Sequence, residues 1–541
     1  MAYTINVPLA VSAVFSVIAV VVLARRSTRE RANPSGLPLP PGPRGFPLLG
    51  NIFDIDPARP WLTYTDWGKK YGDIVYSSLL GQDYIVINSV KVARDLLEQR
   101  SSISSGRPTP TLYKLFGVDF LTVMLGNTEE WKLHRKLFNL TLRMEVIVEH
   151  RDLYSRKAHH LILNMLRGST ESPGQVEEHL SDFSTAIIMA ITYGYEVTSR
   201  EDPLVVRVRK LNKVISSDMP AERAVVLTAF PLLRYLPGCF PGMAFKRDAS
   251  DCNTLAAEVR DIPFDYVKEQ VAAGIVSRSM VSNFFQSYKE DDIDDNMERA
   301  MKDTAATVFV AGADTTSFTL LTFVLAMVLY PDVQTRAQEE IDAVVGKDEL
   351  PGFEHRSSLP YVEAILRETL RWHAVAPLGM PHVTTASDTY NGYYIPKGMS
   401  EAIFTLPILL TNRSLGAVMV YNLWAMSRAS PDDADHFDPA RYLLPYGQLS
   451  PKDSFSVSPS FGFGRRVCPG KFLAEESIWI AVVTMLATLR FAKALDADGR
   501  EVEVTPEFTT GNVIRPIPFG CRTTSRSAGR VKELRAEFGP T

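Results

Sequence analysis

Ten residues around Cys468 (461–470) constrain the fold of this chain more than any other stretch. Three glycines and one proline among them exclude a regular helix or strand. Glycine lets the backbone approach a flat ligand closely, and amide N–H groups that point at a sulfur tune a metal bound to it. Arg465 and Arg466 add positive charge, which favours a thiolate over a thiol. The stretch therefore predicts a loop that presents the sulfur of Cys468 as an anion.

The sequence after this loop turns apolar, from Phe472 to Val483, and predicts a buried helix. A thiolate in front of that helix gains from the helix dipole. A lone cysteine is more often a small buried hydrophobe, which is the alternative interpretation. A full match to the pattern Phe-x-x-Gly-x-Arg-x-Cys-x-Gly argues against that alternative. The matched residues are Phe461, Gly464, Arg466, Cys468 and Gly470.

This pattern resembles the haem-binding loop of the cytochrome P450 superfamily. The resemblance implies that these five residues bind haem and that Cys468 is the metal ligand, an axial thiolate whose electron donation promotes O–O cleavage. It also implies a mainly α fold, with one large helical domain and small β-sheets. The likeness covers nearly the whole chain after Pro34. Around residues 368–382 the sequence is similar to microsomal fungal members of the O-methylsterigmatocystin oxidoreductase type.

The composition excludes several other classes of protein. With 45% hydrophobic and 22% charged residues the chain is globular, and its net charge of -4 without basic runs argues against nucleic acid as a partner. The four cysteines form no CxxC pair, so neither a zinc site of that type nor a disulfide framework is expected. A reducing compartment fits this pattern.

The N-terminus predicts a membrane anchor. Residues 7–24 are apolar apart from two serines, which is close to the minimum for a transmembrane helix, and four arginines follow. Because the positive charge comes after the apolar run, we expect an uncleaved single-pass anchor (1–31) in the endoplasmic reticulum membrane, with the catalytic part in the cytosol. A buried core helix is the alternative. The proline-rich residues 32–50 predict a stiff hinge, and 51–541 a haem-thiolate catalytic domain.

Residues 305–330 are apolar nearly all round and predict either a second membrane span or a long core helix. Asp314 near the middle favours the core helix, because an aspartate in hydrocarbon is costly. We expect Gly312 to leave room for a flat cofactor or oxygen. Asp314 and Thr315 resemble the oxygen-activation segment of the family, in which the acid and the alcohol guide protons. The resemblance makes these two residues the catalytic pair.

Three further residues are expected to bind the haem propionates. Trp131 and Arg135 lie four apart, on one helix face, and resemble the family's propionate-binding helix. His382 matches the position where relatives place another propionate donor. We interpret His134 as an exposed helix residue and not an iron ligand. Short strands are expected at 74–77 and 83–87 around Gly81, and a helix at 91–98.

Two other sets of residues follow from the resemblance. Glu368 and Arg371 lie three apart, and with Arg441 they match the family's buried ion-pair triad, which stabilises the fold and the haem loop. The substrate pocket would be lined by the helix around 305–330, by an apolar strand at 374–380 and by the turn at 508–511. The pocket residues are Ala311, Val375, Leu378 and Thr510.

Residues 399–418 are an anomaly. Relatives have a tight turn between the strands at 392–398 and 419–426, whereas this chain inserts a largely apolar stretch that a hairpin cannot absorb without exposing an apolar patch. Our hypothesis is a translated retained intron, because Met-Ser-Glu and Ala417-Val418 are compatible with splice-signal codons. A gene sequence without those splice signals would refute it.

The resemblance implies a monooxygenase that inserts one oxygen atom of O2 into a lipophilic substrate, in fungal secondary metabolism or xenobiotic oxidation. Electrons would come from NADPH through a reductase that docks on the Cys468 face. The residues that would supply positive charge there are Lys132, Lys136, Arg465 and Lys471. Two alternatives stay open: a membrane-anchored haem protein disabled by the insert, and a haem-thiolate isomerase.

Overall fold

The computed structural model describes residues 33–47, 49–108, 111–167, 172–218, 227, 235–236, 238–240, 243, 245–275, 277–288, 292–397, 417–429, 433–451 and 454–538. The predicted anchor (1–31) and nearly all of the insert lie outside these residues. Part of the predicted hinge is described, and it is tied to the body of the protein. The carbonyl oxygens of Pro38 and Pro41 accept hydrogen bonds from Tyr394 (2.8 Å) and Tyr76 (2.9 Å). The hinge therefore runs along two small sheets.

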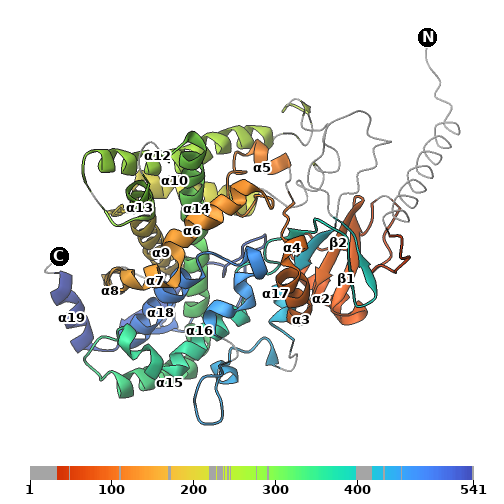
Figure 1. Cartoon of the computed structure of the whole chain (residues 1–541). Helices are drawn as coiled ribbons and strands as arrows, with labels where there is room; N and C mark the ends of the chain where they lie inside the picture. Colours follow the sequence, from red (N-terminus) through yellow and green to blue (C-terminus); the bar gives the residue numbers. More distant parts are fainter. Residues whose placement is uncertain are drawn as a thin grey trace.

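The fold is mainly α, as predicted, with the strands β1 and β2 on one side of the helical part (Figure 1). The helices are α2 (Pro60–Tyr71), α3 (Val90–Ala93), α4 (Ser101–Ser104), α5 (Thr111–Leu115), α6 (Glu129–Leu142), α7 (Met144–Ile147), α8 (Arg151–Arg167), α9 (Gln175–Tyr193), α10 (Pro203–Lys213), α12 (Phe245–Ala272), α13 (Met280–Ser287), α14 (Asp295–Leu329), α15 (Pro331–Val344), α16 (Pro360–Trp372), α17 (Leu423–Met426), α18 (Lys471–Thr488) and α19 (Ala528–Phe538). The predicted helix at 91–98 continues from α3 into a π-helical segment, Arg94–Gln99.

The main sheet has the order β1-β2-β6-β3. β1 (Ile74–Leu79) and β2 (Gln82–Ile87) form the predicted hairpin around Gly81, with Ile74 opposite Ile87. β2 pairs in parallel with β6 (Val418–Tyr421), and β6 pairs antiparallel with β3 (His382–Val383). The remaining strands are β4 (Asp388–Tyr390), β5 (Tyr393–Ile395), β7 (Leu489–Lys493) and β8 (Cys521–Ser525), which form two two-stranded sheets.

The strands that flank the insert do not pair with each other. β5 folds back on β4 through Asn391 and Gly392, both with positive φ, which is the turn that an Asn-Gly pair favours. β6 belongs to the other sheet. Ala417 is fully buried and Val418 pairs with Tyr84 and Val383, so these two residues are part of the core and not of the insert.

α14 crosses the centre of the helical part (Figure 1). It begins at Asp295, ten residues before the expected start, because the Asp294 carboxylate accepts a hydrogen bond from the N–H of Met297 and caps the helix. Among the described residues it is the one helix long and apolar enough to span a membrane, and most of it is buried inside the protein. This burial favours the core-helix interpretation.

Gly312 serves helix packing and not the approach of a cofactor, contrary to our expectation. A Cβ at this position would lie 2.4 Å from Cδ1 of Ile188 on α9. The Ser184 hydroxyl of the same helix donates to the Gly312 carbonyl at 2.9 Å. The missing side chain thus lets α14 and α9 pack closely. Residues 374–380, predicted as a strand, form a turn instead, in which the N–H of Gly379 bonds to the carbonyl of Ala376.

Candidate functional site

The loop around Cys468 is held by its own backbone and by the chain beneath it. The N–H of Cys468 donates to the carbonyl of Phe461 at 2.8 Å. Gly464 has φ +55, and a Cβ there would lie 2.3 Å from the carbonyl oxygen of Leu97. No larger residue fits that contact. The predicted buried helix, α18, begins directly after Gly470. The loop therefore holds Cys468 in front of a helix N-terminus.

Charges near Cys468 come from different residues than the sequence suggested. Burial raises the pKa of the Cys468 thiol, whereas the Gly470 N–H, Arg135 and Lys471 lower it. Arg466 turns away from the sulfur: its Nε donates to the Ser105 carbonyl at 2.9 Å, and its guanidinium lies 4.2 Å from the centre of the Trp131 ring. The two arginines of the loop were thus wrongly assigned to the thiolate.

Trp131 and Arg135 both lie on α6, as expected from their spacing. Trp131 is buried under Arg466, and Nη1 of Arg135 donates to the carbonyl of Val467, next to Cys468, at 2.9 Å. α6 is thereby joined to the loop. His134 was predicted as exposed and is fully buried. The spacing of Trp131, Phe138 and Leu142 places it within the buried stripe of α6.

Two buried arginines, one of them in the loop, lie near a buried histidine. Arg107 Nε, Arg466 Nη2 and His382 Nε2 are buried without a hydrogen-bond partner. Burial lowers the pKa of Arg107 to about 10 and that of Arg466 to about 9, and it lowers the pKa of His382 well below its usual value. Arg107 and Arg466 also interact with His382 electrostatically. Such a group is costly unless an anion accompanies it.

Arg107 was missed by the sequence analysis. Its Nη1 donates to the carbonyls of Met380 and Pro381, at 2.6 Å each, which joins the segment after α4 to the segment before β3. One feature of the sequence could have revealed Arg107: it lies in a long stretch, between Glu98 and Asp119, that contains no Asp or Glu. Such an arginine must find its partner elsewhere in the fold or in a ligand.

Three residues in the protein interior keep accessible surface. Ala311 and Thr315 are exposed although they lie at the middle of α14, most of whose side chains are buried. They lie four apart and thus on one face of the helix. Cys468 is deep enough for burial to raise the pKa of its thiol, yet it is only partly covered. We refer to the region beside the uncovered Ala311 and Thr315 of α14 as the interior space.

Asp314 and Thr315 point in different directions. The Thr315 hydroxyl donates to the Ala311 carbonyl at 2.9 Å and stays on the exposed face of α14. Burial raises the pKa of Asp314, while a hydrogen bond with Asn212 of α10 and the charge of Arg515 lower it in part. The alcohol therefore faces the interior space, and the acid contacts the polar groups behind α14.

The other predicted pocket residues come from two segments. Val375 is half-buried, and its carbonyl accepts a hydrogen bond from the N–H of Ile514 at 2.8 Å, which holds the C-terminal turn with exposed Thr510 next to it. Leu378 is half-buried and packs against the apolar cluster of the main sheet. The structure thus brings Val375 and the Thr510 turn together, and it places Leu378 toward the sheet.

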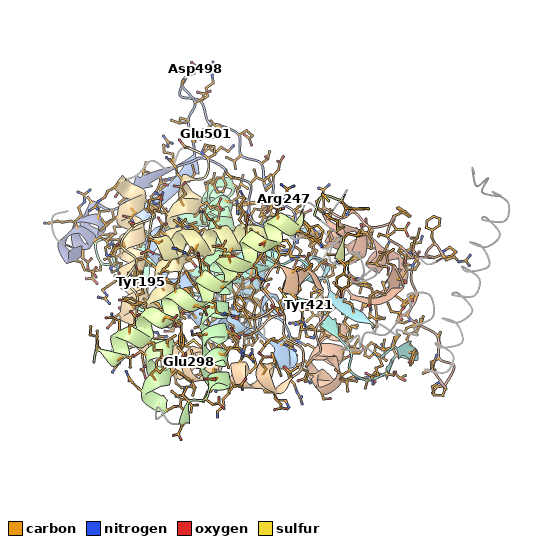
Figure 2. All side chains as sticks on the ribbon, turned by 90° about the horizontal axis from the view of Figure 1, so that it is seen from above. Tyr195, Arg247, Glu298, Tyr421, Asp498 and Glu501 are labelled. Atoms are coloured by element: carbon orange, nitrogen blue, oxygen red, sulfur yellow. The ribbon has the colours of Figure 1, made fainter. Side chains whose placement is uncertain are left out.

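The sheet contacts the Cys468 loop through Tyr421, the last residue of β6. Its hydroxyl accepts a hydrogen bond from the N–H of Met380 at 3.1 Å. Its ring meets Phe463 of the loop edge-on, with ring centres 5.4 Å apart, and His382 at 5.7 Å. Figure 2 shows Tyr421 where the sheet meets the helical part. The sheet therefore buttresses the loop and the buried basic group.

Glu368, Arg371 and Arg441 form one buried cluster. The fully buried Glu368 carboxylate accepts from Arg371 at 2.6 and 2.8 Å and from Nε of Arg441 at 3.1 Å. It also accepts from the backbone N–H of Asp438 at 2.9 Å. Arg371 donates further to the carbonyls of Ala434 and His436. This cluster fixes the segment before the Cys468 loop to α16.

The four residues expected to supply positive charge near Cys468 differ in exposure. Lys132, Lys136 and Arg465 are exposed, and Lys471 is half-buried. Lys132 pairs with Glu129 at 2.6 Å. The charge at this face is therefore partly neutralised by α6 itself.

Comparison with known proteins gives two findings. The family model for cytochrome P450 matches residues 40–412 and 414–514, in two parts that meet inside the anomalous segment. The chain is 34% identical to cytochrome P450 monooxygenase 98 of Postia placenta over 520 residues, which is 95% of this chain and 94% of the relative. It is 34% identical to cytochrome P450 monooxygenase claR of Ampulloclitocybe clavipes (92% and 88%) and 32% identical to cytochrome P450 monooxygenase COX1 of Coprinopsis cinerea (95% and 96%).

Proposed function

Because this chain belongs to the cytochrome P450 family and is a haem-thiolate monooxygenase, we propose that Cys468 is its iron ligand and that its substrate is a lipophilic small molecule. We further propose that the enzyme resembles microsomal fungal members of the O-methylsterigmatocystin oxidoreductase type. Its electrons come from an NADPH-dependent reductase, and residues 1–31 anchor it in the endoplasmic reticulum membrane. The reaction belongs to secondary metabolism or xenobiotic oxidation.

The observations that support this assignment best are the partly uncovered Cys468 in the matched loop and the exposed Ala311 and Thr315 at the middle of α14. A flat group bound in the interior space would bury Cys468, Ala311 and Thr315. The two carboxylates of haem also match the buried basic group, because Arg107 and Arg466 each have an N–H group that needs an acceptor. The residues of the chain thus fit haem, which supplies the dioxygen chemistry when bound.

The chain's own residues hold and orient the reacting groups. Cys468 supplies the thiolate, and the Gly470 N–H stabilises its charge. Trp131, Arg135, Arg107 and His382 are the residues that would hold the propionates. Thr315 places a hydroxyl in the interior space, and Asp314 exchanges protons with the polar groups behind α14.

Replacement of Thr315 by Ala is expected to uncouple NADPH consumption from product formation. The hydroxyl is the polar group that α14 exposes to the interior space, so its loss removes a proton donor there. We expect product per NADPH to fall by about 10²-fold, the usual scale of one acid–base group. Asp314→Asn should slow both NADPH oxidation and product formation. The measurement compares NADPH oxidation, hydrogen peroxide and product from one reaction.

Thr322→Ala is the matched control. Thr322 lies two turns after Thr315 on α14, and its hydroxyl donates the same kind of hydrogen bond, to the Phe318 carbonyl. It should keep the coupling of the wild type. Equal coupling in the Thr315 and Thr322 variants would contradict the role of Thr315.

Replacement of Arg107 by Met is expected to weaken haem retention. The Arg107 side chain is 7% exposed, and a charged hydrogen bond contributes about 1.5–3 kcal/mol, which corresponds to roughly 10- to 150-fold in affinity. Transfer of haem to an excess of a haem-scavenging protein measures the loss rate. Arg465→Met, in the exposed position of the loop, is the control and should release haem like the wild type.

The substrate class is tested by co-expression with an NADPH-dependent reductase and a panel of lipophilic compounds under ¹⁸O2. The proposal predicts incorporation of one labelled oxygen atom, dependent on NADPH. Turnover that needs neither NADPH nor O2 would identify an isomerase instead.

A further inference from the structure

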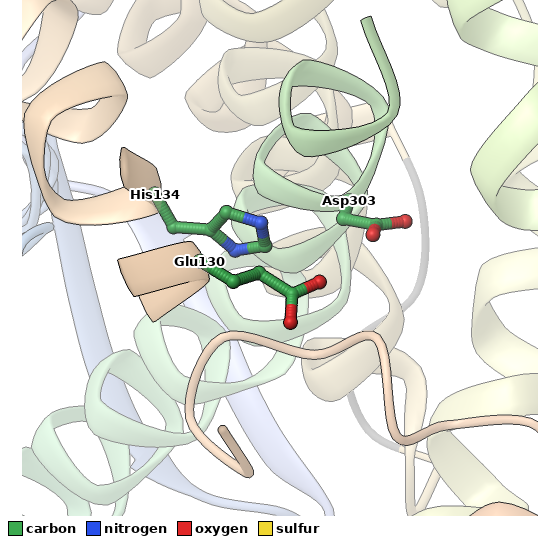
Figure 3. A group of neighbouring side chains, drawn as sticks. All are labelled: Glu130, His134 and Asp303. Carbon is green, nitrogen blue, oxygen red and sulfur yellow. The ribbon is translucent and has the colours of Figure 1, made fainter. Parts of the chain in front are cut away.

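A second cluster of ligating side chains lies between α6 and α14, away from Cys468. Glu130, His134 and Asp303 each offer a ligand atom, and these atoms all lie within 4.8 Å of one another. Figure 3 shows Glu130 and His134 projecting from α6 toward Asp303 on α14. His134 is fully buried and Asp303 is 3% exposed, so the cluster belongs to the helix interface.

The hydrogen bonds behind His134 are compatible with the tautomer that a metal ligand needs. The Thr307 hydroxyl donates to the Asp303 carbonyl at 2.7 Å and accepts from the N–H of Thr122. The Thr122 hydroxyl can donate to Thr307 at 3.3 Å, which leaves its oxygen to accept from Nδ1 of His134 at 2.8 Å. Nδ1 then carries the proton, and Nε2 carries a lone pair. A ligating histidine is oriented in just this manner.

The lone pair of His134 Nε2 therefore meets two carboxylates, and all three groups are acceptors. Nε2 of His134 and Oδ1 of Asp303 are buried without a hydrogen-bond partner. Three acceptors in a buried space repel one another unless a cation lies between them.

The neighbouring arginines do not supply a cation between the three acceptors. Nε of Arg260 lies 3.9 Å from Oδ1 of Asp303, beyond hydrogen-bond distance, and Arg260 bonds to Asp261 at 2.9 and 3.1 Å. Nη2 of Arg299 lies 3.9 Å from Oε1 of Glu130, and its side chain is largely exposed. Both arginines also line a cleft of about 300 Å³ between α12 and α14.

We propose that Glu130, His134 and Asp303 bind a divalent transition-metal ion, with Zn²⁺ as the best match. One imidazole and two carboxylates are ligands that zinc accepts, and water completes the usual tetrahedron. Ligand atoms around such an ion are separated by about 3.3 Å, so the side chains must close by about 1.5 Å at most. Glu130 is half-buried and long enough to move. The ion ties α6 to α14 and thereby fixes the face of α6 that carries Trp131 and Arg135.

The test uses the full-length holoenzyme without an affinity tag, stripped with a chelator and dialysed against zinc. Elemental analysis gives the ratio of zinc to haem iron. We expect one zinc per iron in the wild type and binding weaker by about 10-fold or more in Asp303→Asn and Glu130→Gln. Glu129→Gln is the matched control, because Glu129 is the exposed acid next to Glu130 and bonds only to Lys132 among the hydrogen bonds described. Its zinc binding should equal that of the wild type.

Two further readouts keep the result decisive. Zinc should raise the melting temperature of the wild type and of Glu129→Gln but not of Asp303→Asn, and X-ray absorption at the zinc edge should show nitrogen and oxygen ligands without sulfur. Absence of stoichiometric zinc, or equal binding in all four proteins, overturns the proposal. A wild type without zinc that is more stable than Asp303→Asn would show that a shared proton already holds the cluster together, which also overturns it.

Discussion

Replacement of Cys468 by Ser is expected to abolish monooxygenase turnover while the fold persists. The change removes the only sulfur in the loop. The Phe461 carbonyl and the Gly470 N–H hold Cys468 in place. Serine oxygen is a poor substitute for a thiolate at haem iron, so the electron donation that promotes O–O cleavage is lost. We expect a fall of at least about 10³-fold, which is about 4 kcal/mol of activation free energy. Product formation with a reductase and NADPH measures it.

The matched control is Cys239→Ser, because Cys239 is an exposed cysteine. It should turn over substrate at the rate of the wild type. Circular dichroism and haem content check that the Cys468 variant is folded. A folded, haem-containing Cys468 variant with more than about a tenth of the wild-type rate would contradict the role of the sulfur.

Replacement of Glu368 by Gln is expected to have the largest effect on stability. The carboxylate is fully buried and is shared by Arg371 and Arg441, so the amide removes the counter-charge of Arg371 and leaves Arg441 with the half-exposed Asp433. Breaking a buried ion pair in this way costs roughly 3–5 kcal/mol. The haem loop should loosen together with α16, so haem loss and unfolding should shift in parallel. Chemical denaturation of the holoenzyme, followed by circular dichroism and haem absorbance, measures both.

Asp433→Asn is the control for this change. Asp433 pairs with the same Arg441 at 3.3 Å, but its side chain is 53% exposed. An exposed pair contributes about 0–1 kcal/mol, so the variant should unfold close to the wild-type midpoint. If Glu368→Gln were as mild as Asp433→Asn, the buried triad would not stabilise the fold.

Local patterns in the sequence predicted much of the fold. The hairpin of β1 and β2 followed from β-branched residues around Gly81, and α18 followed from the apolar run after Gly470. Spacing alone placed Trp131 and Arg135 on one helix, and Glu368 near Arg371. These features depend on neighbours within a few residues, and such neighbours are visible in a sequence.

Features that depend on distant contacts were mostly missed. Gly312 is needed because Ile188 of α9 packs on it, and no pattern around Gly312 reveals that partner. β6 pairs with β2 and β3 and not with β5. The Asn391-Gly392 turn pairs β5 with β4 instead. Arg466 turns toward Trp131 and Ser105, so the positive charges nearest the sulfur come from other segments.

His134 was a miss that the sequence itself could have prevented. From the sequence alone, we interpret it as an exposed helix residue. The helical period of Trp131, Phe138 and Leu142 includes position 134 in the buried stripe. A buried histidine needs partners for both ring nitrogens, and that requirement leads to the cluster with Glu130 and Asp303.

The most direct test of the account is the optical difference spectrum of the reduced holoenzyme with and without carbon monoxide. If the Cys468 sulfur anion binds haem iron, the wild type shows the red-shifted Soret band of thiolate-ligated haem, and Cys468→Ser does not. The same band in the Cys468→Ser variant, or a folded wild type that binds no haem, would contradict the central claim.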